Sequence, residues 1–241
     1  MIQVIDYHKV YRDLPAVAGL SFEVRGGSIL GLVGPNGAGK TTTLRALAGI
    51  IPPTHGRLLI AGHDIVTDAV AAKQQLAYVP DDPKLFDTLT VWEHLQFIAS
   101  AYNVVDYETR ATEYLETFEL LEKRDTITQE LSRGMRQKVA IACAYLHDPK
   151  AILFDEPLTG LDPHGIRTLK ASIKSRAAAG AAVIVSSHLL ALVEDLCTEL
   201  LILQKGRALF WGSVAQAHEQ FGELGASLED VFFRALEGPA S

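Results

Sequence analysis

A glycine-rich segment close to the N-terminus limits what this chain can fold into more than any other part of its sequence. Residues 34–41 read Gly-Pro-Asn-Gly-Ala-Gly-Lys-Thr and match the pattern G-x-x-x-x-G-K-S/T. The apolar residues 28–33 before it predict a buried strand, and residues 40–48 after it predict a helix that ends at Gly49. A strand, a glycine loop and a helix in this order form a cradle for phosphate, because backbone N–H groups and the helix N-terminus face the anion. The segment therefore predicts an α/β fold with a nucleotide-binding loop, without separating kinases, GTPases and ATPases.

The same loop predicts which residues contact the nucleotide. We expect Lys40 to reach the β- and γ-phosphates and the Thr41 hydroxyl to ligate Mg²⁺. A glycine-rich structural turn is the alternative interpretation, and the strand and helix on either side of the loop disfavour it. The predicted cofactor-binding residues in the loop are Asn36, Gly37, Ala38, Gly39, Lys40, Thr41 and Thr42.

Two adjacent carboxylates follow a second apolar strand. Residues 151–154 are Ala-Ile-Leu-Phe, and Asp155 and Glu156 come directly after them. Open α/β sheets place ligand chemistry at the carboxyl ends of their strands, where this pair would lie. We expect Asp155 to hold Mg²⁺, directly or through water, and Glu156 to act as the general base that polarises the attacking water. The alternative is a solvated charge pair at a strand end, which the phosphate loop upstream disfavours.

Hydrophobic periodicity divides the rest of the chain into strands and helices. Residues 1–33 predict short strands, whereas the helical period dominates from Thr90 to about Leu146. Thr90 and Glu93 form a capping box for the first of three helices, and the third begins just after Ser132. Strands at 151–154 and 182–185, a helix opened by Asp162-Pro163, a hairpin over 199–211 and a capped helix at 227–233 follow.

The composition limits the possible partners. A formal net charge of −7 disfavours nucleic acid and a polybasic lipid anchor. Residues 1–6 read as a strand and not as a secretory signal, and no apolar run approaches the ~20 residues that span a bilayer. Cys143 and Cys197 lie in apolar runs and are expected to be small core residues in a reducing compartment. Any association with a membrane is therefore expected to run through a protein partner.

Residues 131–135, Leu-Ser-Arg-Gly-Met, make a family resemblance specific. Together with the phosphate loop, the carboxylate pair, residues 160–162 (Gly-Leu-Asp) and residues 186–188 (Ser-Ser-His), they follow the motif order of ATP-binding cassette (ABC) ATPases. The chain resembles this family over essentially its whole length. The resemblance implies one α/β domain: a P-loop NTPase core with a mostly parallel sheet, a small antiparallel β subdomain and an inserted α-helical subdomain. Within the single domain 1–241, the expected bounds are 1–82 and 150–212 for the core with its β subdomain, 83–149 for the helical subdomain and 213–241 for a C-terminal helical tail.

The family's signature segment suits an anionic ligand. Ser132 offers a hydroxyl and Gly134 a bare N–H at the start of a helix. Ser132 is also a good N-cap, and the two roles are compatible because one hydroxyl cannot satisfy every free N–H of a helix start. The resemblance implies a head-to-tail dimer, in which this segment binds the ATP held by the phosphate loop of a second ABC ATPase subunit, identical or different. Asp162 is expected to contact the facing subunit, and its capping role is an equal and compatible alternative.

The resemblance assigns two further residues. His188 is expected to contact the γ-phosphate and to complete a catalytic set with Lys40 and Glu156. Tyr11 is expected to stack on adenine, worth about 1–3 kcal/mol by analogy with base stacking, and an ordinary strand tyrosine is the alternative. The remaining seven histidines are assigned no role and are expected in loops or at exposed positions: His8, His55, His63, His94, His147, His164 and His218.

Two positions depart from the commoner family pattern. Asp81 follows the predicted strand 76–79, where the family usually has glutamine, and its carboxylate still offers an oxygen to Mg²⁺. Arg133 replaces a glycine of the commoner signature, and no role for it follows from the sequence. Asp81, Met135 and residues 227–232 resemble a branch of ATPases that are paired with polytopic membrane exporters.

The sequence therefore predicts an ATP-hydrolysing subunit of an ABC transporter, with ATP and Mg²⁺ as cofactors. It would lie at the cytoplasmic face of the cell membrane and drive a separate polytopic membrane subunit. The sequence favours export over import as the direction of transport. Residues 83–90 are expected to face that subunit, and Lys84-Leu85-Phe86 would receive a helix end from it or pack as an ordinary loop. The alternatives are an importer ATPase, a soluble non-transport ABC ATPase and an inactive regulatory cassette. A single cassette without coiled-coil or zinc insertion disfavours the soluble class, and the intact catalytic set disfavours the inactive one.

Overall fold

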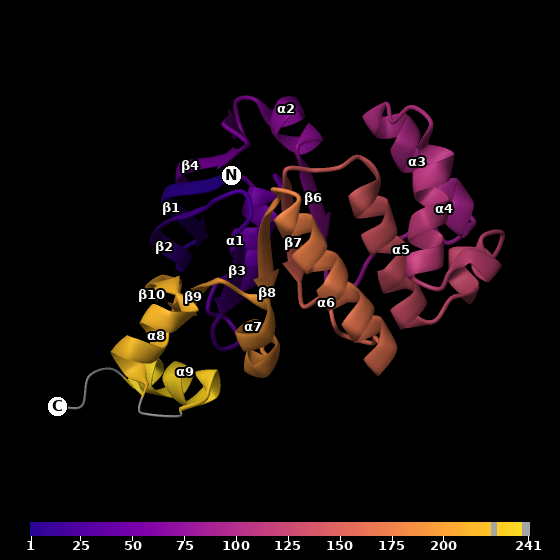
Figure 1. Ribbon diagram of the computed structural model, residues 1–241. Helices are drawn as coiled ribbons and strands as arrows, with labels where there is room; N and C mark the ends of the chain where they lie inside the picture. Colours follow the sequence, from indigo (N-terminus) through magenta and orange to yellow (C-terminus); the bar gives the residue numbers. More distant parts are fainter. Residues whose placement is uncertain (223–225, 238–241) are drawn as a thin grey trace.

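The computed structural model describes residues 1–222 and 226–237, and its larger sheet lies at the centre of the molecule (Figure 1). The strands of this sheet are β3 (Ile29–Val33), β6 (Leu76–Val79), β7 (Ala151–Asp155), β8 (Ala182–Ser186), β9 (Glu199–Gln204) and β10 (Arg207–Ser213). Their order is β10-β9-β3-β8-β7-β6. Among the described residues of this sheet, β10 and β9 pair antiparallel, and every other pair of neighbouring strands is parallel. The strand before the phosphate loop therefore lies next to β8, and the strand before the two carboxylates lies on the other side of β8.

A smaller antiparallel sheet carries the N-terminal strands. It consists of β1 (Ile2–Tyr11), β2 (Leu14–Val24), β4 (His55–Ile60) and β5 (His63–Asp64), in the order β2-β1-β4-β5. The prediction of short strands in this region was wrong, because β1 and β2 have 10 and 11 residues. A break in the β1–β2 register between Val4 and Tyr7, where Asp6 has φ 47°, lets β1 bend and continue.

Helices pack on both faces of the larger sheet, and the side chains of β3 show why. Leu30 and Leu32 belong to the hydrophobic core that contains α1 (Lys40–Leu47), and Ile29 and Val33 belong to the core that contains α6 (Pro163–Ala178). Successive side chains of a strand point to opposite faces, so a strand buried on both faces is apolar throughout. The remaining helices of the core and tail are α2 (Ala69–Gln74), α7 (Leu190–Leu196), α8 (Val214–Phe221) and α9 (Leu228–Glu237).

Three helices form the insertion between β6 and β7 at one side of the molecule in Figure 1, where the first two are magenta and the third is drawn in a redder shade. They are α3 (Val91–Tyr102), α4 (Tyr107–Thr117) and α5 (Arg133–Leu146), with 3₁₀ turns at Leu121–Lys123 and Thr128–Glu130. The predicted capping box at the start of α3 is confirmed. The Thr90 hydroxyl accepts a hydrogen bond from the Glu93 N–H at 3.1 Å, and the Glu93 carboxylate accepts one from the Thr90 N–H at 2.7 Å.

His94 corrects one of the sequence-based expectations. It was expected in a loop or at an exposed position, but it lies within α3 and is 4% exposed. Its Nε2 accepts a hydrogen bond from the Phe86 N–H at 2.9 Å, so the ring proton is on Nδ1, which donates to the Thr90 carbonyl at 2.8 Å. The ring therefore ties the loop before α3 to the first turn of that helix.

The predicted fold class is confirmed: a mostly parallel sheet, a small antiparallel sheet and an inserted group of helices. The subdomain boundaries stay a prediction. Of the predicted C-terminal tail, residues 223–225 and 238–241 lie outside the described residues. Within the described part, no helix has both the length and the apolar character needed to cross a membrane.

Candidate functional site

The phosphate loop connects β3 to α1, and Gly39 shows why it needs glycine. Gly39 has φ +105°, a left-handed conformation that glycine adopts without a steric penalty. A Cβ atom at Gly39 would also lie 2.9 Å from the carbonyl oxygen of Ala16, which is in β2. The loop is thus fixed against the smaller sheet and leads directly into the N-terminus of α1, a place that favours an anion.

Lys40, the first residue of α1, is a partly desolvated cation. Its Nζ donates hydrogen bonds to the carbonyl oxygens of Gly34 at 2.7 Å and Pro35 at 3.3 Å. Desolvation by burial lowers the pKa of Lys40, and the negative charges of Glu156 and Asp155 oppose that shift. The loop lysine and both carboxylates therefore act on one another electrostatically, and phosphate binding by Lys40 stays a prediction.

Asp155, at the end of β7, is a buried carboxylate held by three hydroxyl groups. It is 4% exposed, and its Oδ1 accepts hydrogen bonds from Ser186 at 2.7 Å and from Thr41 at 3.2 Å. Its Oδ2 accepts one from the Tyr78 hydroxyl at 3.3 Å. Burial, followed by the charge of Asp155, raises the pKa of Tyr78 to about 12, so the phenol stays protonated and donates. The Thr41 hydroxyl and the Asp155 carboxylate are oxygen donors of the kind that Mg²⁺ prefers, so this pair fits the predicted cation.

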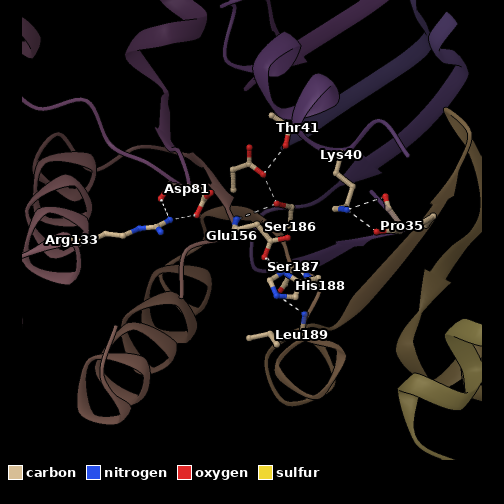
Figure 2. A network of polar contacts seen from close by, with 12 residues as sticks. Pro35, Lys40, Thr41, Asp81, Arg133, Glu156, Ser186, Ser187, His188 and Leu189 are labelled. Atoms are coloured by element: carbon tan, nitrogen blue, oxygen red, sulfur yellow. Dashed lines mark hydrogen bonds and ion pairs between the residues drawn. The ribbon is translucent and has the colours of Figure 1, made fainter. Parts of the chain in front are cut away.

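Glu156, the next residue, has a strained backbone at the centre of the network (Figure 2). Its φ is 49°, which is uncommon for a residue other than glycine, and its N–H donates to the Ser186 carbonyl at 3.1 Å. Its Oε2 lies 2.8 Å from Nδ1 of His188 and 3.4 Å from the His188 N–H nitrogen. The Glu156 side chain is 21% exposed and that of His188 is 66% exposed, so the pair faces outward from the buried Asp155. Such strain is typical of functional sites.

The signature segment lies at the start of α5, next to the loop that leads into α6. The exposed Ser132 is the N-cap of α5, and its hydroxyl accepts a hydrogen bond from the Met135 N–H at 3.2 Å. A Cβ atom at Gly134 would lie 2.5 Å from the carbonyl oxygen of Gly160, so the two backbones are in direct contact. In the same loop, Asp162 caps α6 by accepting a hydrogen bond from the Gly165 N–H at 2.6 Å.

The two residues that depart from the family pattern contact each other. The Arg133 Nη2 lies 3.0 Å from the Asp81 Oδ1 and 3.5 Å from the Asp81 carbonyl oxygen (Figure 2). The Asp81 carboxylate therefore has a cationic partner on α5, and its role as a Mg²⁺ ligand stays a prediction. Sequence reasoning found no role for Arg133, because its partner lies 52 residues away.

The structure sorts the predicted residues into three places. Lys40, Thr41, Asp155, Glu156 and His188 form one polar network at the phosphate loop. Tyr11 is 46% exposed at the end of β1, opposite Leu14, on the hairpin whose second strand contacts Gly39. Sequence reasoning missed Tyr78, which lies within β6, and gave no role to Ser186, the last residue of β8. The third place combines the starts of α5 and α6 with the loop after β6. It holds Ser132 and Gly134 of the signature segment, Asp162 before α6 and Asp81 after β6.

A phosphate loop, a buried carboxylate at a neighbouring strand end and a Glu–His pair define a P-loop nucleotide-binding protein. The family model described as ABC transporter matches residues 17–159. The chain is 34% identical to the ABC-type transporter ATP-binding protein EcsA of Bacillus subtilis, over 100% of this chain and 98% of that protein. It is 33% identical to the Nod factor export ATP-binding protein I of Cupriavidus metallidurans, over 98% of this chain and 78% of that protein. The chain therefore belongs to the ABC transporter family and carries its ATP-binding domain.

A solved structure agrees with this assignment. The chain described as "Structure of ATP binding subunit of ABC transporter" superposes with a TM-score of 0.94 at 34% sequence identity. The superposition covers 98% of this chain and 99% of that one.

Proposed function

We propose that this chain hydrolyses ATP as one half of a head-to-tail pair and thereby drives a separate membrane subunit. The observation that carries the hydrolysis is the polar network itself. It brings Lys40 and Thr41 of the phosphate loop together with Asp155, Glu156 and His188 at the ends of two adjacent strands.

Within this proposal, each side chain has a definite task. Lys40 binds the terminal phosphates of ATP, and Glu156 takes the proton of the water that attacks the γ-phosphorus as the bond to ADP breaks. His188 orients Glu156 through the 2.8 Å contact at Nδ1, and donation from Nε2 to an oxygen of the γ-phosphate requires a proton on both ring nitrogens. Thr41 and Asp155 would hold Mg²⁺, which neutralises phosphate charge when it is bound.

The start of α5 supports the paired arrangement. An α-helix leaves the N–H groups of its first turn without partners inside the helix. Here the Ser132 hydroxyl caps only the Met135 N–H. The N–H groups of Arg133 and Gly134 make no hydrogen bond with the described part of the chain. Exposed N–H groups at a helix start favour an anion such as the γ-phosphate of ATP bound to a facing subunit. Each chain would then carry half of two composite sites.

The concentration dependence of ATP hydrolysis tests this proposal. We expect the specific activity at saturating ATP to rise with protein concentration and to level off once the chains are paired, because a monomer has only half of each site. Phosphate release over a dilution series, with light scattering to follow association, measures this. A constant specific activity in samples shown to be monomeric would contradict the paired site.

A substitution at Ser132 separates its capping role from binding in the facing subunit. Ser132→Ala is expected to lower the stability of α5 by about 1 kcal/mol through loss of the cap, and to lower turnover in the paired state by about tenfold through loss of a hydrogen bond to a charged group. Ser132→Asn restores a good cap and is expected to recover stability but not turnover. The measurements are thermal unfolding, turnover and ATP affinity of the monomer, which stays unchanged. Wild-type turnover in Ser132→Asn would leave Ser132 only a capping role.

A groove at the base of the helical insertion supports a membrane partner. It has a volume of about 250 Å³ and lies between the loop after β6, α3 and α5, with Pro83, Leu85, Ile98 and Tyr102 among its lining residues. Phe86, the next residue in the chain after Leu85, is 54% exposed. An apolar hollow with an exposed aromatic ring next to it in the chain suits the end of a helix from the partner. We therefore infer that this face docks on a polytopic subunit, which would hold the chain at the cytoplasmic face of the membrane.

Export is the direction that we infer. The relative from Cupriavidus metallidurans is named for the export of Nod factor. The aspartate at position 81 and the methionine at position 135 favour the same branch, where an importer ATPase would more often have glutamine at position 81. An importer ATPase remains the alternative within the family.

A further inference from the structure

Arg133 connects three segments that are far apart in the sequence. It is the first residue of α5, and its guanidinium binds Asp81, which follows β6. A Cβ atom at Gly160 would lie 3.2 Å from both Cγ and Cδ of Arg133, so the aliphatic part of the side chain covers the loop before α6. One side chain thus touches the end of a core strand, the start of the signature helix and the loop that carries Asp162.

The backbone beneath Arg133 is also tightly packed. Gly134 lies directly on the Gly160 carbonyl, as described above, and a second ionic cluster flanks the same helix. There the carboxylate of Glu119 lies 3.3 Å from Nζ of Lys138 on α5 and 3.3 Å from Nδ1 of His164 on α6. The first two turns of α5 are therefore attached to α6 and the loop before it through Gly134 and Lys138, and Arg133 adds an attachment to the loop after β6.

We propose that Arg133 is a positioning residue for ATP hydrolysis: with Asp81 and Gly160 it fixes the direction in which the signature segment is presented to the facing subunit. The inference rests on the proposed head-to-tail function. Arg133 touches no reacting atom, since it acts through the orientation of Ser132 and Gly134, the next residue on each side.

The expected effect is on orientation more than on stability. The Arg133 and Asp81 side chains are 47% and 48% exposed, and exposed ion pairs contribute little to the free energy of folding. A small displacement of a binding group, by contrast, lowers turnover strongly. Loss of the Arg133 contacts should therefore lower the rate of the paired enzyme while the chain remains folded and each phosphate loop still binds ATP.

Arg133→Gln tests the proposal, with Arg25→Gln as the matched control because Arg25, the residue after β2, forms an exposed ion pair with Glu23. We expect Arg133→Gln to lower kcat at saturating ATP and saturating protein by about three- to tenfold. The affinity of the monomer for a fluorescent ATP analogue should stay within about twofold of wild type, because that site lies in the phosphate loop. Hydrogen exchange of the Met135 and Arg136 amides, which are hydrogen-bonded to Ser132, should rise in Arg133→Gln and not in the control.

A charge swap provides the second arm. Arg133→Asp combined with Asp81→Arg restores the ion pair but no ligand for a metal ion, so recovery of at least half of the lost turnover relative to Arg133→Asp alone supports the positioning role. The positioning role is overturned if the charge swap recovers none of the lost turnover. It is also overturned if Arg133→Gln has the same turnover and the same hydrogen exchange as Arg25→Gln. If wild-type specific activity does not depend on protein concentration, the head-to-tail function fails first, whereas a concentration-dependent wild type with an unaffected Arg133→Gln overturns only the role of Arg133.

Discussion

Glu156→Gln will lower the turnover of ATP by at least about a hundredfold, because general-base catalysis contributes about 10²–10⁴ to a rate. The substitution keeps the shape of the side chain. In the wild-type structure Nδ1 of His188 lies 2.8 Å from Oε2, and an amide oxygen at that place still accepts its hydrogen bond. The amide cannot take a proton from water near neutral pH. Binding of ATP and pairing of the two chains therefore remain, and the pair stays closed on unhydrolysed ATP.

Two measurements check this outcome: steady-state phosphate release, and the mass of the protein in the presence of ATP by size exclusion with light scattering. Glu194→Gln is the matched control, since the Glu194 carboxylate contacts His218 of α8 and the Leu228 N–H at the start of α9, each at 3.4 Å. The control should hydrolyse ATP at nearly the wild-type rate and dissociate after turnover. Wild-type turnover in Glu156→Gln would remove Glu156 from the role of base and would require another group to take the proton.

Local features of the fold could be predicted from the sequence because both partners stand close together in the chain. Thr90 and Glu93 are three residues apart, and Asp162 caps the Gly165 N–H from three residues away. Such contacts form wherever the helix forms, whatever surrounds it. The apolar strands were equally readable, since a strand buried on both faces is continuously apolar.

The interior of the site could be predicted only in part, because its contacts join distant segments. Tyr78 donates to Asp155 over 77 residues, and Arg133 reaches Asp81 over 52. No periodicity or spacing in one sequence reports such pairs, which depend on the order of the strands in the sheet. The contacts of the Tyr78 hydroxyl and the Arg133 guanidinium therefore depend on the position of β6 beside β7, which the sequence alone does not give.

His94 shows a different limit. A histidine on a helix of mixed polarity carries no sign of its burial, because the ring is tolerated wherever both nitrogens find partners. Those partners are backbone groups of Phe86 and Thr90. Backbone groups have no sequence signature, so the burial of His94 beneath the loop before α3 could not be predicted from the sequence.

Gly134→Ala will lower turnover in the paired state by about a hundredfold, a loss that a displacement of roughly 1 Å can produce. The new Cβ would stand 2.5 Å from the carbonyl oxygen of Gly160, closer than any van der Waals contact allows, so the start of α5 must shift away from the loop before α6. We expect a destabilisation of about 1–3 kcal/mol from the same overpacking. Alanine keeps the backbone N–H, so lost activity reports the position of the donor and not its removal. Turnover, urea unfolding and ATP affinity of the monomer measure these effects.

Gly62→Ala is the control for the loss of stability alone. Gly62 follows β4 with φ +90°, and a Cβ atom there would meet nothing within 4 Å. Forcing alanine into this left-handed conformation costs about 1–2 kcal/mol through the backbone, which matches the destabilisation expected at Gly134, at a position outside the phosphate-loop network. If the two variants lose similar stability and only Gly134→Ala loses turnover, the contact between Gly134 and Gly160 positions the signature segment. Equal turnover in the two variants would instead mean that the start of α5 tolerates displacement, and that the glycine is retained for folding.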